Sequence, residues 1–278
     1  MRKIFYALLI VISIVSFAAA NLKEDIASNI KNNLIRQGAK NPKVKVTILE
    51  KIKDTNIYFV KIIATGDNIK RPINAFLLSD GKYLYPDAIN LISGEKMLET
   101  LKSKYNIVKF TKKDLKNFTL IEGNKDAKNT IVMITDFECP FCKKAHFLIK
   151  ELLKNKSKKN YAFYILHYPL KNMHKKAELF SKILIAGAKF GLDFRDELYN
   201  FNNKSLSDKK ILEIFANKTK DPKKFKKIAL SKETSEQIKR NIEKGNSLGV
   251  KGTPVIIING KRIDGFNQEL IKKYINEI

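Results

Sequence analysis

Cysteine and histidine are scarce in this sequence, with two cysteines and three histidines among 278 residues. In the loop-closure model, a bridge between Cys139 and Cys142 would stabilise a fold by only about 2 kcal/mol. The pair therefore excludes a disulfide-stapled scaffold, and its spacing favours reactivity. A structural zinc needs four ligands, but only His146 has ligand-like spacing to the cysteines, so the sequence predicts no metal and no cofactor. We expect His146 to be a partly exposed helix residue and not a thiolate partner.

Acidic residues are also few. The sequence has 28 Asp and Glu against 54 Lys and Arg, so the formal net charge is +26. A charge of this size can mark a protein that binds the phosphate backbone of nucleic acids. Only six of the basic residues are arginine, however, and the lysines are spread along the whole chain. We therefore interpret the charge as solvated helix faces and expect no nucleic acid among the partners.

Long apolar runs are absent after residue 20, and a membrane-spanning helix needs about 20 apolar residues. The start of the chain differs, because Arg2 and Lys3 precede the uncharged run Ile4–Phe17, which is followed by the small residues Ala18–Ala20. This is the pattern of a cleaved secretory signal peptide. The run is too short for the alternative, a membrane anchor. The sequence thus predicts a signal peptide at residues 1–20 and a mature protein in the periplasm.

Residues 21–105 are predicted to form a small α+β domain. Leu22–Gln37 carries an i, i+4 apolar stripe typical of a helix. Val44–Ile48 alternates apolar with polar residues, as a half-buried strand does, and Tyr58–Ile63 is a second β-rich run. Pro72–Tyr85 contains a Gly-bearing turn and is typical of a hairpin. The module has no Cys, no His and no clustered acid pair, so we assign it no chemistry.

A charged, helix-prone linker is predicted at residues 106–118, and a second domain at residues 119–278. The second domain shows strand, helix and strand patterns, then a long helical stretch with Ser207 and Thr234 as candidate caps, then a hairpin and a final helix. The predicted segments are the strands Ile131–Phe137 and Tyr161–His167, the helical stretch His174–Leu248, and the hairpin Pro254–Gly265.

The run Cys139-Pro140-Phe141-Cys142 carries the chemistry, at the end of an apolar strand and the start of a helix. Pro140 is tolerated in a first helical turn. Cys139 then lies where the helix dipole and unpaired N–H groups stabilise an anion, which lowers a thiol pKa. Cys142 lies one turn deeper and can attack a mixed disulfide formed at Cys139. Cys139 is thus the predicted nucleophile and Cys142 the resolving thiol. Phe141 offers no imidazolium, so we expect a less oxidising couple than a His there would give.

Five segments, in order along the chain, together resemble the catalytic domain of the DsbA-like thioredoxin-fold family of thiol:disulfide oxidoreductases. They are Gly123–Ala127, Ile131–Cys142, Tyr168–Leu170 followed by His174, Leu248–Pro254, and Asn259–Gly265. The resemblance covers about residues 118–278. It implies an α/β fold in which a thioredoxin-like catalytic domain with a helical insertion follows the α+β domain and the helical linker. It also implies a redox-active disulfide between Cys139 and Cys142, and a cis Thr253–Pro254 bond packed against it.

The layout of the whole chain is similar to that of the DsbC/DsbG isomerases, in which the first module is a dimerisation domain. This similarity implies a homodimer formed through residues 21–105. One position departs from the thioredoxin-fold pattern. A buried acid often stands six residues before the first cysteine as a proton acceptor, and Met133 stands there in this chain. We therefore assign no acid/base residue.

The sequence thus predicts an exported thiol:disulfide oxidoreductase that forms or rearranges disulfides through Cys139 and Cys142, supported by Pro140, Phe141 and the Thr253–Pro254 pair. The direction, oxidase or isomerase, stays open. The expected partners are exported substrate proteins that contain cysteine, and a membrane redox partner. The alternative is a chaperone-like protein that binds unfolded exported proteins, and its affinity would survive replacement of both cysteines by Ser.

Overall fold

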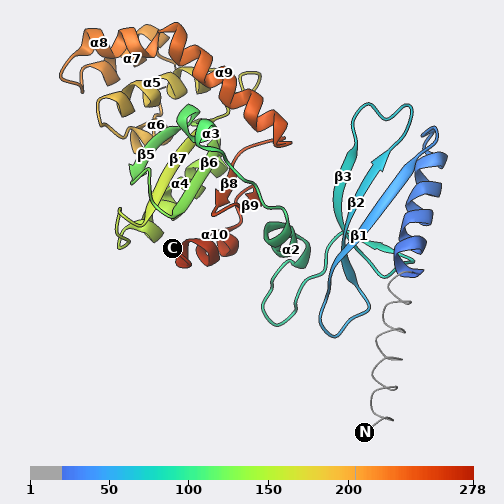
Figure 1. Cartoon of the computed structure of the whole chain (residues 1–278). Coiled ribbons are helices and arrows are strands. Elements are labelled where there is room, and N and C mark those ends of the chain that lie inside the picture. Colours follow the sequence, from blue (N-terminus) through green and yellow to red (C-terminus); the bar gives the residue numbers. More distant parts are fainter. Residues whose placement is uncertain (1–20, 204) are drawn as a thin grey trace. The chain divides into compact units, whose positions relative to one another are not determined.

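The computed structural model describes residues 21–203 and 205–278 (Figure 1). The chain divides between Tyr105 and Asn106 into two compact units, each with its own sheet and apolar core. The predicted signal peptide, residues 1–20, lies outside the described residues. Within the described residues, no helix has both the length and the apolar character needed to cross a membrane.

The first unit is an antiparallel sheet flanked by two helices. A helix over residues 21–36 comes first, and α2 (Met97–Tyr105) comes last. The four strands lie in chain order as β1 (Lys43–Lys51), β2 (Tyr58–Thr65), β3 (Ile73–Ser79) and β4 (Leu84–Tyr85). The helix, the two strands and the hairpin predicted from the sequence are all present, and the α+β class of this unit is confirmed.

The two faces of this sheet carry separate apolar clusters, because successive side chains of a strand point to opposite faces. Val60 and Ile62 of β2 cluster with Ile26 of the N-terminal helix. Phe59, the neighbour of Val60, clusters with Leu101 of α2 on the other face. Neighbouring positions of one strand therefore hold a helix on each side of the sheet.

The second unit is a mixed sheet with helices around it. The strand order is β5-β7-β6-β8-β9, in which β6 and β7 are parallel and the other neighbours antiparallel. Its elements are α3 (Lys112–Asn117), β5 (Thr119–Gly123), β6 (Asn129–Thr135), α4 (Pro140–Leu153), β7 (Tyr161–His167), α5 (Ala177–Lys189), α6 (Arg195–Tyr199), α7 (Asp208–Ala216), α8 (Pro222–Ala229), α9 (Lys232–Ser247), β8 (Val255–Ile258), β9 (Lys261–Asp264) and α10 (Gln268–Asn276).

Strand β6 occupies the centre of this sheet, and its residues from Ile131 onward are buried. Ile131 and Met133 belong to the larger apolar cluster, which contains residues of α4 and α10. Val132 and Ile134 belong to a smaller cluster on the opposite face. Because both faces are covered, the strand is a continuous apolar run instead of an alternating one. The strand, helix and strand predicted around the cysteines are β6, α4 and β7.

Helices α5 to α9 fill the segment between β7 and β8, as predicted from the helical signals there. Ser207 caps α7, and its hydroxyl accepts a hydrogen bond from the N–H of Lys210. The prediction of Thr234 as a cap is wrong. Ser231 begins α9 and accepts from the N–H of Thr234 at 3.1 Å, so Thr234 lies inside the first turn. Both residues carry a hydroxyl, and only the one before the first helical residue can cap.

Residues 106–118, predicted as a linker, are an integral part of the second unit. The Val108 N–H donates to the Gly260 carbonyl at 2.8 Å. Thr111 and Asp114 form a reciprocal capping box at the start of α3. Phe118 is only 5% exposed and lies in the smaller apolar cluster. The linker assignment is therefore wrong, because the few apolar residues between the lysines of this segment are core residues.

Replacement of Phe118 by Ala tests this correction. A buried Phe→Ala change costs about 3–5 kcal/mol of unfolding free energy, through lost burial and the cavity left behind. We expect a loss of that size in urea unfolding of the full chain followed by circular dichroism. Leu230→Ala, at a side chain that is 63% exposed, is the control and should change the free energy by less than about 0.5 kcal/mol. If Phe118→Ala changes the free energy of unfolding no more than that control does, residues 106–118 contribute no more to stability than a linker would.

Candidate active site

Helix α4 begins at the first of the two cysteines. Cys139 is the N-cap residue, with extended backbone angles (φ −76°, ψ 122°), and Pro140 takes the first helical position. The missing N–H of Pro140 would have had no helical partner there. The Cys139 side chain makes no capping hydrogen bond. The first N–H groups of α4 are therefore available to stabilise negative charge on its sulfur.

The environment of Cys139 favours the thiolate. Its pKa is lowered to about 5, and the largest cause is the hydrogen bond from the thiol of Cys142. The N–H groups of Cys142 and Phe141 and the hydroxyl of Thr253 act in the same direction, whereas burial opposes them. At neutral pH Cys139 is therefore a thiolate, which is the nucleophilic form of cysteine.

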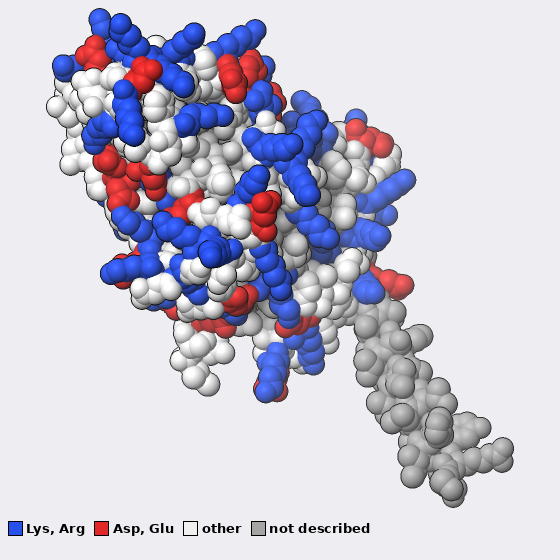
Figure 2. Space-filling model, turned by 60° about the vertical axis from the view of Figure 1, so that its left-hand side comes forward, with Lys and Arg blue, Asp and Glu red and all other residues white. Residues whose placement is uncertain are grey.

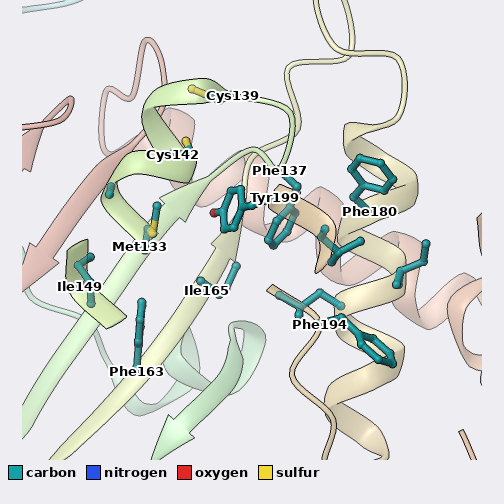
Figure 3. Packing of buried hydrophobic residues seen from close by; sticks show 14 of the residues in the cluster. Met133, Phe137, Cys139, Cys142, Ile149, Phe163, Ile165, Phe180, Phe194 and Tyr199 are labelled. Carbon is teal, nitrogen blue, oxygen red and sulfur yellow. The ribbon is translucent and has the colours of Figure 1, made fainter. Parts of the chain in front are cut away.

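Cys142 has the opposite character. Both cysteines are free thiols, and the Cys142 side chain is fully buried in the larger apolar cluster at the start of α4 (Figure 3). Burial is the main cause that raises the pKa of Cys142 well above its ordinary value, and the neighbouring Cys139 raises it further. Cys142 therefore keeps its proton while Cys139 carries the charge. The two sulfur atoms differ in charge and in access to solvent.

The start of β8 brings Thr253 and Pro254 to the cysteines. Val255 pairs with Ile134 of β6, so the residues before Val255 lie beside the turn that follows β6. In the protonated state, the Cys139 thiol donates to the Thr253 carbonyl at 3.3 Å. The Thr253–Pro254 peptide bond is cis, as the family resemblance implies, and Pro254 is buried. The structure thus brings together residues that are 114 positions apart.

The two residues between the cysteines face solvent. Pro140 is exposed, and Phe141 is 54% exposed. The ammonium of Lys144 lies 5.5 Å from the centre of the Phe141 ring. The surface next to Cys139 therefore combines an apolar ring with a positive charge. The supporting roles predicted for Pro140 and Phe141 stay predictions.

Asp136 is a residue of the site that the sequence analysis did not assign. It is fully buried, and its carboxylate accepts from the N–H groups of Glu138 at 2.8 Å and Leu170 at 2.7 Å. His174 Nδ1 lies 2.9 Å from the same carboxylate. Asp136 thus ties the loop after β7 to the turn that presents Cys139. An Asp that accepts from the N–H two residues on is typical of an Asx-turn, which was the available signal.

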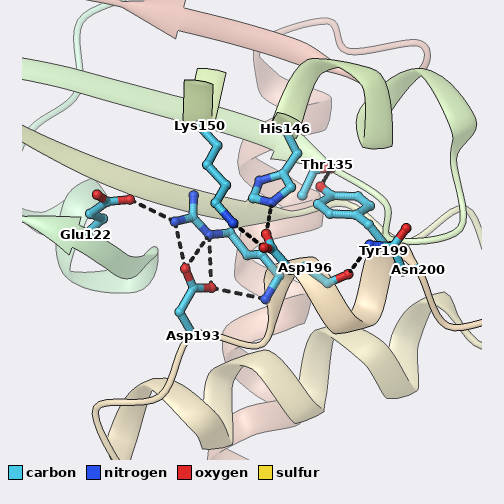
Figure 4. A network of polar contacts seen from close by, with 9 residues as sticks. Glu122, Thr135, His146, Lys150, Asp193, Asp196, Tyr199 and Asn200 are labelled. Carbon is cyan, nitrogen blue, oxygen red and sulfur yellow. Dashed lines mark hydrogen bonds and ion pairs between the residues drawn. The ribbon is translucent and has the colours of Figure 1, made fainter. Parts of the chain in front are cut away.

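His146 is not the partly exposed residue that we expected. Its side chain is 1% exposed, and Nε2 lies 2.7 Å from the carboxylate of Asp196 in α6, which also binds Lys150 (Figure 4). Burial is the main cause that lowers the pKa of His146 to about 4, so the ring is neutral at pH 7. The expectation failed because four residues after Cys142 is the same face of the helix, and that face is buried. Within the described part of the chain, no group of three or more Cys, His, Asp or Glu side chains could hold a metal ion.

The positive charge forms no single patch on the face seen in Figure 2. Lys and Arg side chains are spread over most of that surface, with Asp and Glu side chains between them. Some basic side chains of the described residues pair with acids, as Lys176 does with Asp208 at 2.6 Å and Lys261 with Glu277 at 2.5 Å. This distribution agrees with the interpretation of the charge as solvated helix faces.

The second unit matches known proteins. The family model described as "Thioredoxin" matches residues 116–277. The "Probable disulfide bond formation protein D" of Bacillus anthracis is 27% identical over 150 residues, which are 50% of this chain and 68% of that protein. The "Na(+)/H(+) antiporter NhaA 3" of Salinispora tropica is 25% identical over 146 residues, which are 52% of this chain. The match spans only 22% of the length of that antiporter. With the family match, the fold class predicted from the sequence is confirmed.

Two solved structures are similar to part of this chain at lower sequence identity. The thiol-disulfide exchange protein alpha-DsbA2 from Wolbachia pipientis is 21% identical with a TM-score of 0.48, over 56% of this chain and 84% of that chain. BdbD from Bacillus subtilis, in its oxidised form, is 19% identical with a TM-score of 0.48, over 59% of this chain and 93% of that chain.

Alkylation of the reduced protein tests the asymmetry of the two thiols. Because only the thiolate reacts, the labelling rate of Cys139 by iodoacetamide should be half-maximal near pH 5 and constant from pH 7 upward. Cys142 should stay unlabelled at neutral pH. In Cys142→Ala the main donor to Cys139 is lost, so the pH of half-maximal labelling should rise. In Cys142→Ser this pH should rise less, because a hydroxyl can still donate. Preferential labelling of Cys142, or an unchanged profile in Cys142→Ala, would contradict this account.

Proposed function

This chain belongs to the thioredoxin family, and we propose that it is an exported thiol–disulfide oxidoreductase working through Cys139 and Cys142. The observation that carries the proposal is the asymmetry of the two thiols at the start of α4. One is a thiolate held at a helix N-terminus, and the other is a buried, protonated thiol one turn away. A structural pair needs no such difference, whereas an exchange enzyme needs a nucleophile and a resolving thiol.

In the oxidising direction, a substrate thiolate attacks the Cys139 sulfur of the Cys139–Cys142 disulfide. A bond forms between substrate sulfur and Cys139, the bond between the cysteines breaks, and its electron pair stays on Cys142. A second substrate thiolate then attacks the substrate sulfur of this mixed disulfide. The substrate leaves with its own disulfide, and Cys139 departs as the thiolate that its surroundings favour.

In the reverse direction, the Cys139 thiolate attacks a wrongly paired disulfide, and Cys142 releases the enzyme when no better substrate thiol is at hand. The low pKa of Cys139 supports the oxidising direction, because it stabilises the reduced protein relative to the disulfide. The relative from Bacillus anthracis, named for disulfide bond formation, supports the same direction. The proposed substrates are exported proteins that contain cysteine, and a membrane redox partner would restore the disulfide. The signal pattern at residues 1–20 supports a place in the periplasm.

The Cys142→Ser variant tests the proposed mechanism. Without the resolving thiol, mixed disulfides formed through Cys139 should accumulate, and they should appear on non-reducing gels as adducts that dithiothreitol removes. Cys139→Ser is the matched control and should form none, because the buried, protonated Cys142 is a poor nucleophile. Adducts that persist in Cys139→Ser would reverse the two roles. Binding of unfolded substrate that survives loss of both cysteines would favour the chaperone-like alternative.

We also propose that the protein is a homodimer formed through residues 21–105. Seven of the eleven exposed large hydrophobic residues in the described chain lie in this smaller unit, which has no chemistry of its own to account for them. Leu91 is 95% exposed and Ile92 100% exposed, side by side in the segment between β4 and α2. Neighbouring apolar side chains that are both exposed are typical of a protein-binding surface. This distribution supports a partner for the first unit.

Sedimentation of the full chain tests the dimer. At micromolar concentration the wild-type protein should sediment as a dimer, and a double variant with Leu91→Asp and Ile92→Asp should sediment as a monomer with unchanged circular dichroism. Two buried leucine-sized side chains contribute about 3–6 kcal/mol to an interface, so the loss should raise the dissociation constant at least a hundredfold. Leu230→Asp, at an exposed apolar residue of the second unit, should leave the dimer intact. A wild-type chain that sediments as a monomer would refute the proposal.

A further inference from the structure

Cys142 poses a chemical problem that the two cysteines alone do not solve. When a substrate thiolate opens the disulfide, Cys142 must leave with a negative charge at a site that is fully buried. Met133 occupies the position at which the sequence resemblance leads one to look for a buried acid, and it is also fully buried. Its thioether is only a weak acceptor and has no proton to donate. The donor to Cys142 must come from elsewhere.

The hydroxyl of Thr135 meets this requirement. Thr135 is the last residue of β6 and is fully buried. Two groups lower the pKa of Cys142 against the effect of burial, first the backbone N–H of Asp136 and then the side chain of Thr135, which is the side-chain donor of the two. The Thr135 hydroxyl lies 2.6 Å from the hydroxyl of Tyr199. In Figure 3 the Tyr199 hydroxyl lies on the side of its ring that faces α4, the helix of Cys142. Two buried hydroxyls, those of Thr135 and Tyr199, therefore lie one after the other next to the resolving thiol.

Tyr199 holds its proton, and its ring is fixed from two sides. Burial is the main cause that raises its pKa well above the ordinary value, so the hydroxyl is a donor at any physiological pH. The ring stacks on His146 at 4.9 Å between centres and lies 4.8 Å from the ring of Phe137. His146 is in turn held by Asp196 (Figure 4).

We infer that Thr135 and Tyr199 form a two-hydroxyl donor that stabilises the Cys142 thiolate as it leaves the disulfide. A threonine hydroxyl has one hydrogen. When the Thr135 oxygen accepts from Tyr199, its own hydrogen is free to donate to the Cys142 sulfur. Tyr199 thus acts as a positioning residue through Thr135. The inference rests on the proposed function, since it assigns a donor to one step of that exchange.

The step balances in atoms and charge. The substrate thiolate brings one negative charge, the bond from substrate sulfur to Cys139 forms, and the bond from Cys139 to Cys142 breaks. The charge then lies on Cys142, where the Thr135 hydroxyl donates a hydrogen bond to it. The donor stabilises the charge that develops on Cys142 in the transition state and that Cys142 carries in the mixed disulfide, so it speeds opening of the disulfide. The reduction potential, an equilibrium property of the protonated Cys142 thiol and the disulfide, should change little.

The experiment measures the rate at which reduced glutathione opens the disulfide of the full-length oxidised protein, together with the reduction potential. Thr135→Val keeps the shape of the side chain and removes the donor. Because a hydrogen bond to a charged group is strong, the rate should fall about tenfold or more. Tyr199→Phe should lower it about threefold, and the double variant should be no slower than Thr135→Val alone. Thr135→Ser should restore the rate to within about twofold of wild type.

Tyr161→Phe is the matched control. It removes another buried tyrosine hydroxyl, which donates to Glu122 at 2.8 Å in the same unit, and it should keep the wild-type rate. Rates in Thr135→Val and Tyr199→Phe equal to that control would overturn the inference. A rate loss matched by a shift in potential and not rescued by Thr135→Ser would also overturn it, since that is the signature of a merely structural role. A wild-type protein that does not exchange with glutathione at all would refute the proposed function itself.

Discussion

The antiparallel pairing of β6 with β8 is the constraint on which the active site depends. The pairing of Ile134 with Val255 places the start of β8 beside the turn that leaves β6. Without this pairing, the Thr253 carbonyl and hydroxyl would not lie against Cys139. Strand β7, the parallel partner of β6, positions the site as well. The two strands end at the same level, so the loop after β7 reaches Asp136 and binds its carboxylate. Since β6 is central and buried, a shift of one residue would turn its core side chains to the wrong face, so the register of the site follows from the core.

The short helix α6 braces the other side of the site. Arg195 is 3% exposed and its charge is balanced by Asp193 and Glu122, both within 3.0 Å (Figure 4). A buried guanidinium with two carboxylate partners is held firmly, because each carboxylate accepts charge-assisted hydrogen bonds from it. Held in this way, the helix presents Asp196 to His146 of α4 and Tyr199 to Thr135 of β6. The buried groups of α6 thus position the surroundings of the resolving thiol, as the core positions those of the nucleophile.

The sequence was sufficient for the parts of the site that are local in the chain. The apolar run of β6, the proline after Cys139 and the periodic face of α4 lie within twenty-five residues, and each has its own signal. The contact with Thr253 was reached only through resemblance, because nothing in its spacing points to residue 139. Tyr199 gave no signal at all, since α6 has five residues, too few to show helical periodicity, and its partner Thr135 is 64 positions away.

The burial of His146 was missed for a similar reason. Polar residues inside an apolar face look solvated until their partner is known.

The hydrogen bond between the two thiols links the nucleophile to the resolving residue. In the reduced protein, the Cys142 hydrogen is directed at the Cys139 thiolate, and this bond is the largest cause of the low Cys139 pKa. Two adjacent thiolates would repel each other, so the pair carries one charge at neutral pH. Once Cys139 is bound to a substrate sulfur, it no longer carries the charge that attracted this hydrogen. The N–H of Asp136 and the hydroxyl of Thr135 are then the groups that can stabilise the charge developing on Cys142. The proposed donor pair is thus needed only in the mixed disulfide and in the transition states on either side of it. In the stable reduced form, the hydrogen bond from Cys142 stabilises the Cys139 thiolate.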